Sequence, residues 1–282
     1  MQAHLPSGIP TLAQYDDLLR TPFFATIRSA GSVFLEENAE ILAPYRQRWV
    51  SDPLHQWSRQ WEYPYALARL EKRIASVRTT QILDAGAGVT FFTYFLADRH
   101  EQIEITCADA DQTLAQIHAA IRSASRDRIH FGEADLRALP YSDRSFDAVY
   151  CLSVLEHTHR YDQVVEELHR VLRPGGTLIV SFDISVDGEA DIPLEQAKVL
   201  IDLLERRFPA TQDLPPSREL LTAAAADSLT TAALAPRDHT LMPWPHPLVC
   251  VLKTLRRGRW PKGWGYTNLT CACHTFEKAR DE

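Results

Sequence analysis

Residues 82–89 read ILDAGAGV, an apolar run that ends in an aspartate and two glycines set two residues apart. A strand that ends in a tight glycine turn before a helix brings bare backbone close to a ligand. It also directs amide donors and the positive end of the helix dipole at that ligand. The stretch therefore predicts a nucleotide-like ligand, although a purely structural turn would also account for Gly86 and Gly88.

Asp84 narrows the class of ligand, because a carboxylate two residues before the first glycine repels a pyrophosphate. A cationic ligand with an amino group and a sulfonium tolerates the same carboxylate. The rival ligand is a dinucleotide, whose G-x-G-x-x-G fingerprint requires glycine where this chain has Phe91. We therefore favour the cationic ligand.

Short apolar, β-branched runs alternate with segments of helical periodicity between residues 81 and 184. The runs are QILDAG, QIEITCAD, RIHFGEA, FDAVYCLSV and GTLIVSFDI, and the helical segments include DQTLAQIHAAIR and YDQVVEELHRVL. Strands that alternate with helices predict a parallel sheet covered on both faces.

The flanking segments predict further elements. LEQAKVLIDLLERRF (194–208) and SRELLTAAAADSL (217–229) read as helices, and YTNLTCACHTFEK (266–278) reads as a final strand. We expect a helical N-terminal extension or cap over residues 1–75. An α/β domain over residues 76–282 follows, with an insert rich in Pro, Trp and basic residues at about 234–265.

Composition excludes several classes of protein. The net charge of −7 argues against general nucleic-acid binding. Five cysteines without disulfide spacing favour a reducing compartment. The first residues lack a secretory pattern, and no stretch is apolar enough to span a bilayer, so we expect a cytoplasmic protein. The oligomeric state stays open, with a homodimer among the options.

Two more acids follow predicted strands. ITCADAD places Asp109 at the carboxyl end of its strand, where a carboxylate can accept hydrogen bonds from both hydroxyls of a ribose. Capping of the next helix is the alternative, and Asp111 is better placed for it.

Asp135 follows the third strand and could accept a hydrogen bond from an exocyclic amine, while the Leu136 amide donates to a ring nitrogen. The alternative for Asp135 is a solvated loop acid.

Five motifs follow one another along the chain: DAGAG, CAD, EADLRALPYSDRSFDAV, VLEH and LHRVLRPGGTLIVSF. In their order and spacing they resemble the class I S-adenosylmethionine-dependent methyltransferases over residues 75–185. The resemblance implies a three-layer, Rossmann-like α/β fold with a seven-stranded, mostly parallel sheet and an antiparallel last strand. It also implies S-adenosylmethionine as cosubstrate, S-adenosylhomocysteine as product, and no metal. The residues it places around the cosubstrate are Asp84, Gly86, Ala87, Gly88, Asp109, Ala110, Asp135, Leu136 and Ser153.

Thr90 departs from this family, which usually has a third glycine there. Close packing at that helix start is therefore in question, and the threonine hydroxyl could cap the helix instead. The two glycines nearest the ligand remain.

CLSVLEHTHRYD (151–162) follows the fourth strand and lies near the expected methyl group. His157 is the candidate general base for a hydroxyl acceptor, with Glu156 as its orienting partner or as a cosubstrate contact. The alternative is a histidine that hydrogen-bonds the backbone and takes no proton.

Acceptor choice is expected to come from outside the common sheet. The substrate-binding candidates are Tyr63, Tyr65, Trp244, Arg256 and Trp264. Packing of the cap on the sheet is the alternative for each aromatic residue. The basic run CVLKTLRRGRWPKGW (250–264) is a solvated face, a site for an anionic acceptor, or a contact with an acidic membrane. CACH (271–274) is predicted to be core packing, because zinc sites use wider spacing.

The sequence thus predicts a methyltransferase for a small-molecule acceptor, with O-methylation in secondary-metabolite or sugar biosynthesis as the first choice. An N- or carboxyl-methyltransferase is the nearest variant. A methyltransferase-like scaffold without turnover, and an enzyme for aminopropyl transfer or cyclisation, are the alternatives from other classes.

Overall fold

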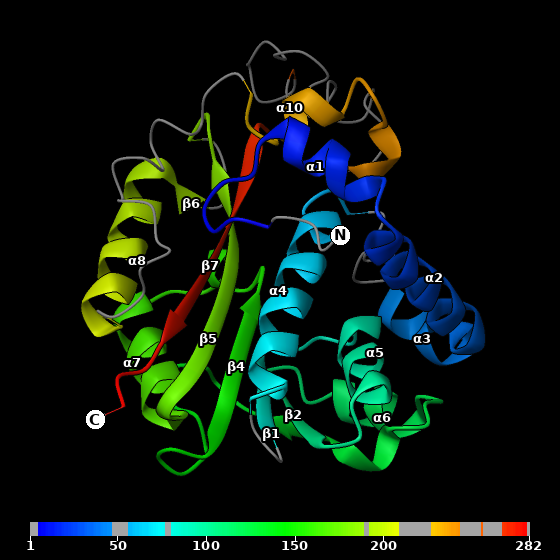
Figure 1. The fold of residues 1–282 in the computed structure, drawn as a ribbon, viewed down its shortest axis with the longest axis vertical. Helices are drawn as coiled ribbons and strands as arrows, with labels where there is room; N and C mark the ends of the chain where they lie inside the picture. Colours follow the sequence, from blue (N-terminus) through cyan, green and yellow to red (C-terminus); the bar gives the residue numbers. More distant parts are fainter. Residues whose placement is uncertain are drawn as a thin grey trace.

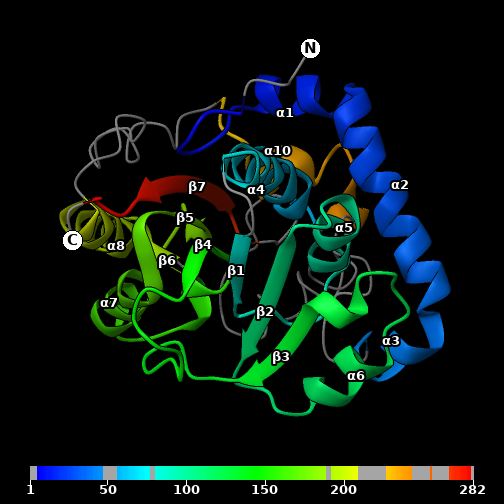
Figure 2. The ribbon, with the colours of Figure 1, turned by 60° about the horizontal axis from the view of Figure 1, so that its bottom comes forward.

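The computed structural model describes residues 5–46, 56–76, 80–188, 192–208, 227–242, 255 and 267–280. Within these ranges seven strands form one sheet with helices on both faces (Figures 1 and 2). The strands are β1 (Thr80–Ala85), β2 (Ile103–Asp109), β3 (Ile129–Glu133), β4 (Phe146–Leu152), β5 (Leu172–Ser185), β6 (Ile192–Pro193) and β7 (Leu269–Glu277). The helices are α1 (Leu12–Leu19), α2 (Pro22–Glu37), α3 (Ala39–Arg46), α4 (Arg59–Ile74), α5 (Phe91–Arg99), α6 (Leu114–Ala120), α7 (Tyr161–Val171), α8 (Leu194–Arg207) and α10 (Thr231–Leu234).

The sheet has the order β3-β2-β1-β4-β5, and β6 and β7 both pair with β5. Strands β1 to β5 are parallel, and β7 is antiparallel to β5. The strand order reverses between β1 and β4, which is where an open α/β sheet leaves a crevice at its carboxyl edge. The predicted Rossmann-like sheet with an antiparallel last strand is confirmed.

Alternate residues of the central strands face two separate cores. Ile82 belongs to the core beneath α4 and α5, whereas its neighbour Leu83 belongs to the core beneath α7 and α8. Because side chains alternate along a strand, a run that is apolar throughout buries both faces. β4 is buried at every residue, including Asp147, which pairs with Arg73 and Arg173. The result is three layers.

The N-terminal helices are part of this packing. Helix α4 lies directly on β4, β5 and β7 (Figure 2). Gly8 exchanges backbone hydrogen bonds with Cys273 of β7, and the side chain of Asn38 bonds both the amide and the carbonyl of Arg122. The helical character predicted for this region is confirmed over α1 to α4, while the domain boundary at residue 75 stays a prediction.

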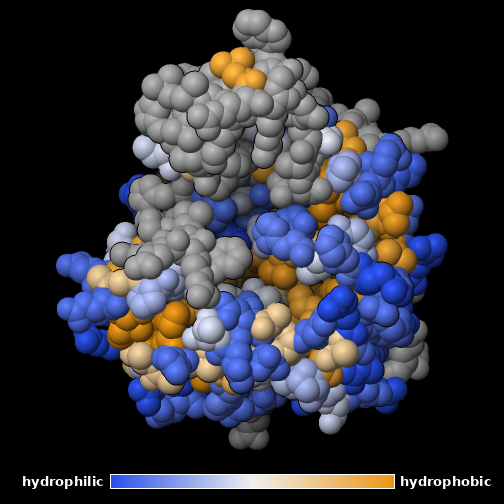
Figure 3. Space-filling view, turned by 180° about the vertical axis from the view of Figure 1, so that it is seen from behind, coloured by the Kyte–Doolittle hydropathy of each residue, from blue (hydrophilic) through white to orange (hydrophobic). Residues whose placement is uncertain are grey.

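The predicted helix at 194–208 and the predicted strand at 266–278 correspond to α8 and β7. Of the predicted helix at 217–229, only residues 227–229 are described, and Ser228 there forms a β-bridge with Thr11. Most of the insert at about 234–265 lies outside the described residues. Among the described residues on the face shown in Figure 3, hydrophilic ones predominate, with apolar residues in patches between them.

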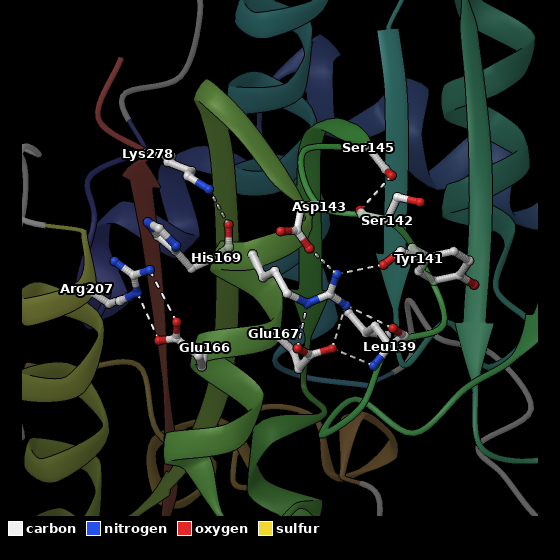
Figure 4. Close-up of polar contacts among 11 residues, drawn as sticks. Leu139, Tyr141, Ser142, Asp143, Ser145, Glu166, Glu167, His169, Arg207 and Lys278 are labelled. Atoms are coloured by element: carbon white, nitrogen blue, oxygen red, sulfur yellow. Dashed lines mark hydrogen bonds and ion pairs between the residues drawn. The ribbon is translucent and has the colours of Figure 1, made fainter. Parts of the chain in front are cut away.

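Arg170 of α7 fixes the loop between β3 and β4 (Figure 4). Its five N–H groups donate to the Glu167 carboxylate, the Asp143 carboxylate and the carbonyls of Leu139 and Tyr141, at 2.7–2.9 Å. Glu167 in turn accepts from the Leu139 amide at 2.7 Å. Since every donor of the planar guanidinium is used, this network specifies the path of the loop. The start of the loop lines a cavity at the carboxyl edge of the sheet.

Candidate active site

A cavity of about 620 Å³ lies at the carboxyl ends of β1, β2 and β4, where the strand order reverses. The structure brings most of the predicted site residues to its wall. Those that line it are Asp84, Gly86, Ala87, Gly88, Asp109, Ala110, Asp135, Leu136, Ser153, Glu156, His157 and Tyr63. Parallel strands present their carboxyl ends at one edge, which is why acids far apart in sequence meet here.

The glycine loop after β1 requires glycine at two positions. Gly86 has a φ of +80° and Gly88 a φ of +51°, both in the left-handed region. A Cβ on Gly86 would lie 2.5 Å from the Val154 side chain, and one on Gly88 would lie 2.6 Å from the Tyr45 hydroxyl. Neither position therefore accepts a side chain without movement of its neighbours.

The amides of this loop bond to the protein itself. Gly86 and Ala87 donate to the carbonyl of Ala108 at 2.8 and 3.0 Å. Gly88 donates to Asp109 at 2.9 Å, and Val89 donates to the Tyr45 hydroxyl at 3.2 Å. The prediction that this loop directs its amides at the ligand is wrong for all four residues. The loop therefore contributes its shape to the cavity, and its backbone can lie close to a ligand.

Thr90 occupies the N-cap position of α5 in extended backbone, but its side chain makes no capping hydrogen bond. The predicted capping role is therefore wrong. The hydroxyl that matters in this helix is that of Thr93, which donates to Asp84 at 2.6 Å. The first helical residues Phe91 and Phe92 are buried, so the helix start packs closely without the third glycine.

Asp84 is a buried carboxyl at the cavity wall. One of its oxygens accepts from Thr93 and from the Tyr150 hydroxyl, at 2.6 and 2.8 Å. Burial raises the pKa of Asp84 to about 7, although the two hydrogen bonds favour the ionised form. A cation placed in the cavity would restore the full charge of this carboxylate.

Asp109 joins the loop to the end of β2. Its two oxygens accept from the amides of Gly88 and Asp111, each at 2.9 Å. A carboxylate has further lone pairs, so both oxygens can still accept from ligand hydroxyls. Asp111 bonds the amide of Thr113 at 3.0 Å, and Thr113 rather than Asp111 is the N-cap of α6, contrary to our prediction.

Asp135 lies at the rim of the cavity beside Arg137. The guanidinium bonds both carboxylate oxygens, with the shortest contact at 2.6 Å. This pairing lowers the pKa of Asp135 to about 2, so the group stays ionised. Leu136 is buried and forms apolar wall next to it.

Ser153, at the end of β4, has a φ of +49°, which is unusual for a residue with a side chain. Its hydroxyl donates to both oxygens of the buried Glu62, at 2.8 and 3.0 Å. Arg59 donates to Glu62 at 2.8 Å and to the carbonyl of Leu152 at 3.0 Å. Helix α4 thereby fixes the end of β4, and Arg59 also lines the cavity.

Glu156 and His157 belong to a short 3₁₀ turn, Leu155–His157, that follows β4 and lines the cavity. The His157 amide donates to the carbonyl of Val154 at 2.9 Å and closes the turn. Both side chains therefore lie where the sequence placed them, at the carboxyl edge beyond β4.

The predicted acceptor residues divide into three groups. Tyr63 lines the cavity, whereas Tyr65 does not, because its hydroxyl bonds Ser7 and Thr275 in the core. The remaining candidates lie outside the described residues, and they are Trp244, Arg256 and Trp264.

The CACH stretch lies in β7 and is completely buried. Cys271 and Cys273 face the core beneath α4, and His274 lies on the opposite side near the ring of Phe182. The core-packing prediction is confirmed. In the ranges that the structure describes, no group of three or more His, Cys, Asp or Glu side chains could hold a metal ion. Over the same residues, no helix combines the length and apolarity needed to cross a bilayer.

The sequence profile of the methyltransferase domain matches residues 83–180, which run from the end of β1 into β5. The chain contains a class I methyltransferase domain. S-adenosylmethionine is the cosubstrate that this family implies, and most residues that line the cavity belong to the matched segment.

Two curated relatives illustrate the range of the family. The methyltransferase domain resembles the methyltransferase GfsG of Streptomyces halstedii, at 37% identity over 39% of this chain and 40% of that protein. It resembles the demethylmenaquinone methyltransferase of Deinococcus radiodurans at 35% identity over 36% of this chain and 42% of that protein. The matched part thus spans about two fifths of each relative's length.

Among solved structures, the [4+2]-cyclase SpnF shares the fold over 97% of this chain and 99% of its own, with a TM-score of 0.51 and 20% identity. At that identity the likeness concerns the fold alone. It extends the similarity beyond the methyltransferase domain to the N-terminal helices.

Proposed function

We propose that this protein is a cytoplasmic enzyme that binds S-adenosylmethionine in the cavity and transfers its methyl group to a small-molecule acceptor, with oxygen as the first choice of acceptor atom. One observation carries the proposal. Asp84 and Asp109 stand at the ends of adjacent strands, while the amides of residues 86–89 are used inside the protein. Such a wall suits a ligand with hydroxyls and positive charge, and it opposes a pyrophosphate.

In this proposal the residues at the ends of different strands contact different parts of the cosubstrate. The Asp109 carboxylate accepts from the ribose hydroxyls, and Asp135 with Leu136 holds the adenine. Asp84 faces the methionine moiety and its amino group, directly or through water. Glu156 and His157 then stand beside the reacting groups, because they line the same cavity beyond the end of β4.

S-adenosylmethionine supplies an electrophilic methyl group on a sulfonium. The acceptor oxygen bonds to the methyl carbon in line as the carbon–sulfur bond breaks, and positioning of the two reactants supplies much of the acceleration. A hydroxyl acceptor also gives up its proton, for which His157 is the proposed base. A nitrogen or carboxylate acceptor would relieve His157 of this duty.

Product mass tests the proposed reaction. The protein is incubated with S-adenosylmethionine and panels of polyketides, sugars and peptides, and products are read by mass spectrometry. A gain of one methyl group in an acceptor supports the proposal. A gain of the 3-amino-3-carboxypropyl group of S-adenosylmethionine, or an acceptor altered without a change in mass, would replace methyl transfer by one of the other reactions.

Replacement of His157 by alanine tests the base role with an acceptor from that screen. Loss of a general base is expected to lower kcat by about 10²- to 10⁴-fold, with cosubstrate affinity nearly unchanged. Unchanged turnover at neutral pH would remove His157 from the mechanism.

Asp84 is expected to make cosubstrate affinity depend on pH. Its pKa of about 7 in the ligand-free protein means that lowering the pH from 7.5 to 6.0 protonates most of this carboxyl. Only the ionised form attracts a cation, so affinity should fall about five- to tenfold over this range. Calorimetric titration at both pH values measures the change, and Asp84→Asn should bind weakly with little pH dependence. A wild-type affinity that does not change would contradict the role of Asp84.

The raised pKa of Asp84 also makes the stability of the folded protein depend on pH. The folded protein keeps this proton up to about pH 7, whereas the unfolded chain releases it near the ordinary value of 3.8. Asp84 therefore contributes its full stabilisation of the fold below pH 3.8, and this stabilisation is lost as the pH rises through 7.

A further inference from the structure

Four stacked rings cross the fold beside the glycine loop. They are Phe34 of α2, Tyr94 of α5, His118 of α6 and Phe131 of β3, with successive centroid distances of 5.2, 6.1 and 5.0 Å. The interplanar angles are 27°, 26° and 25°. Tyr94 and His118 are both buried. The His118 ring therefore lies between two aromatic faces that fix its plane.

Both nitrogens of the His118 ring are hydrogen-bonded. Nε2 lies 2.8 Å from the carbonyl of Gly88, and Nδ1 lies 2.8 Å from the Tyr94 hydroxyl. A carbonyl only accepts, so Nε2 carries the hydrogen. Burial lowers the pKa of His118, which favours the neutral ring, and Nδ1 then accepts from Tyr94.

Tyr45 of α3 contacts the same peptide unit from its other side. The carbonyl of Gly88 and the amide of Val89 belong to one peptide group, and that amide donates to the Tyr45 hydroxyl at 3.2 Å. The oxygen of this group is thus held by α6 and its N–H by α3. These two helices lie next to each other at the edge of the molecule (Figure 2).

The orientation of this peptide group matters because Gly88 is in the left-handed region. Glycine has no Cβ, so its flanking peptide groups rotate with little steric hindrance. A rotation of the group between Gly88 and Val89 would swing its oxygen to the position of its N–H and change the cavity wall. Two side chains that bond opposite ends of the group oppose that rotation.

We propose that His118 and Tyr45 are positioning residues that fix the peptide group between Gly88 and Val89 in the orientation that cosubstrate binding needs. The inference rests on the proposed function, because it concerns the cosubstrate loop. It gives the N-terminal helices a part in the site: α3 supplies one bond, and Phe34 of α2 supports the ring that makes the other.

Three variants test this arrangement. His118→Leu removes both ring bonds, His118→Gln keeps a donor for the Gly88 carbonyl, and Tyr45→Phe removes the acceptor of the Val89 amide. His118→Leu and Tyr45→Phe each remove one hydrogen bond to the peptide group between Gly88 and Val89, and this loss is expected to weaken S-adenosylmethionine binding about tenfold. His118→Gln should recover part of the affinity. Binding is measured by calorimetry, and amide exchange of residues 86–92 is measured in the ligand-free protein.

Leu204→Ala is the matched control, since Leu204 is buried in α8 on the opposite side of the sheet. It should lower the melting temperature without changing affinity or loop exchange. If His118→Leu behaves like Leu204→Ala in both measurements, the positioning role is overturned. If the wild type binds no S-adenosylmethionine, the proposed function fails, and loop exchange in the ligand-free variants still decides whether these residues fix the loop.

Discussion

Replacement of Asp109 by alanine is expected to abolish measurable binding of S-adenosylmethionine. The change removes the proposed acceptor for two ribose hydroxyls and leaves the Gly88 amide without its partner. Hydrogen bonds to a carboxylate are stronger than neutral ones, so loss of this set should weaken binding by about 100-fold or more. Calorimetric titration of the purified variant measures the effect.

Asp109→Asn separates the two roles of this side chain. The amide oxygen can still accept from Gly88, so the loop is retained, while the charge and one acceptor oxygen are lost. An intermediate affinity is expected. Binding by Asp109→Ala within threefold of the wild type would show that the ribose contact lies elsewhere.

Gly86→Ala is expected to have the second large effect, on both stability and binding. The new Cβ would lie 2.5 Å from two Val154 carbons, at a φ of +80° that residues with side chains rarely adopt. Strain and overpacking together should lower the free energy of unfolding by about 2–4 kcal/mol. The displaced loop should also lose its affinity for the cosubstrate, since Gly86 lines the cavity.

Gly188→Ala provides the matched control. Gly188 has a φ of +71°, close to that of Gly86, but a Cβ there would meet nothing within 4 Å. Its loss of stability therefore reports the backbone strain alone, and its affinity should equal that of the wild type. Val154→Ala in the Gly86→Ala background should relieve the clash and recover part of the melting temperature. Equal effects of Gly86→Ala and Gly188→Ala would contradict the steric account.

The sheet and the convergence of the acids could be predicted because both follow from local sequence. The strands β1 to β5 correspond to short, mainly apolar runs, and parallel strands carry the residues after them to one edge. The two-residue strand β6 has no such run and was not predicted. Asp84, Asp109, Asp135 and His157 were therefore placed correctly at one cavity. Burial on both faces also explains why β4 shows no alternation of polar residues.

The residues that hold the loop could not be predicted, because their partners are distant in sequence. Tyr45 and His118 reach the peptide group at Gly88 through the packing of α3 and α6, and neither carries a motif. The use of the loop amides inside the protein depends on the same contacts. No periodicity in the sequence encodes which side of a loop a separate helix approaches.

The different positions of Tyr63 and Tyr65 on α4 could have been predicted from the sequence. Tyr63 and Tyr65 are two residues apart on a helix, which turns their side chains by about 200° relative to each other. They could not both face the cavity. The structure places Tyr63 at its wall and Tyr65 in the core near β7.

The most direct test of the account is calorimetric titration of the wild-type protein with S-adenosylmethionine and S-adenosylhomocysteine at pH 7.5. We expect one site per chain with an affinity on the order of 1–100 μM. Both ligands should bind it, because cosubstrate and product share the ribose and the adenine. Absence of binding to both ligands at millimolar concentration would contradict the cosubstrate site and favour a methyltransferase-like scaffold.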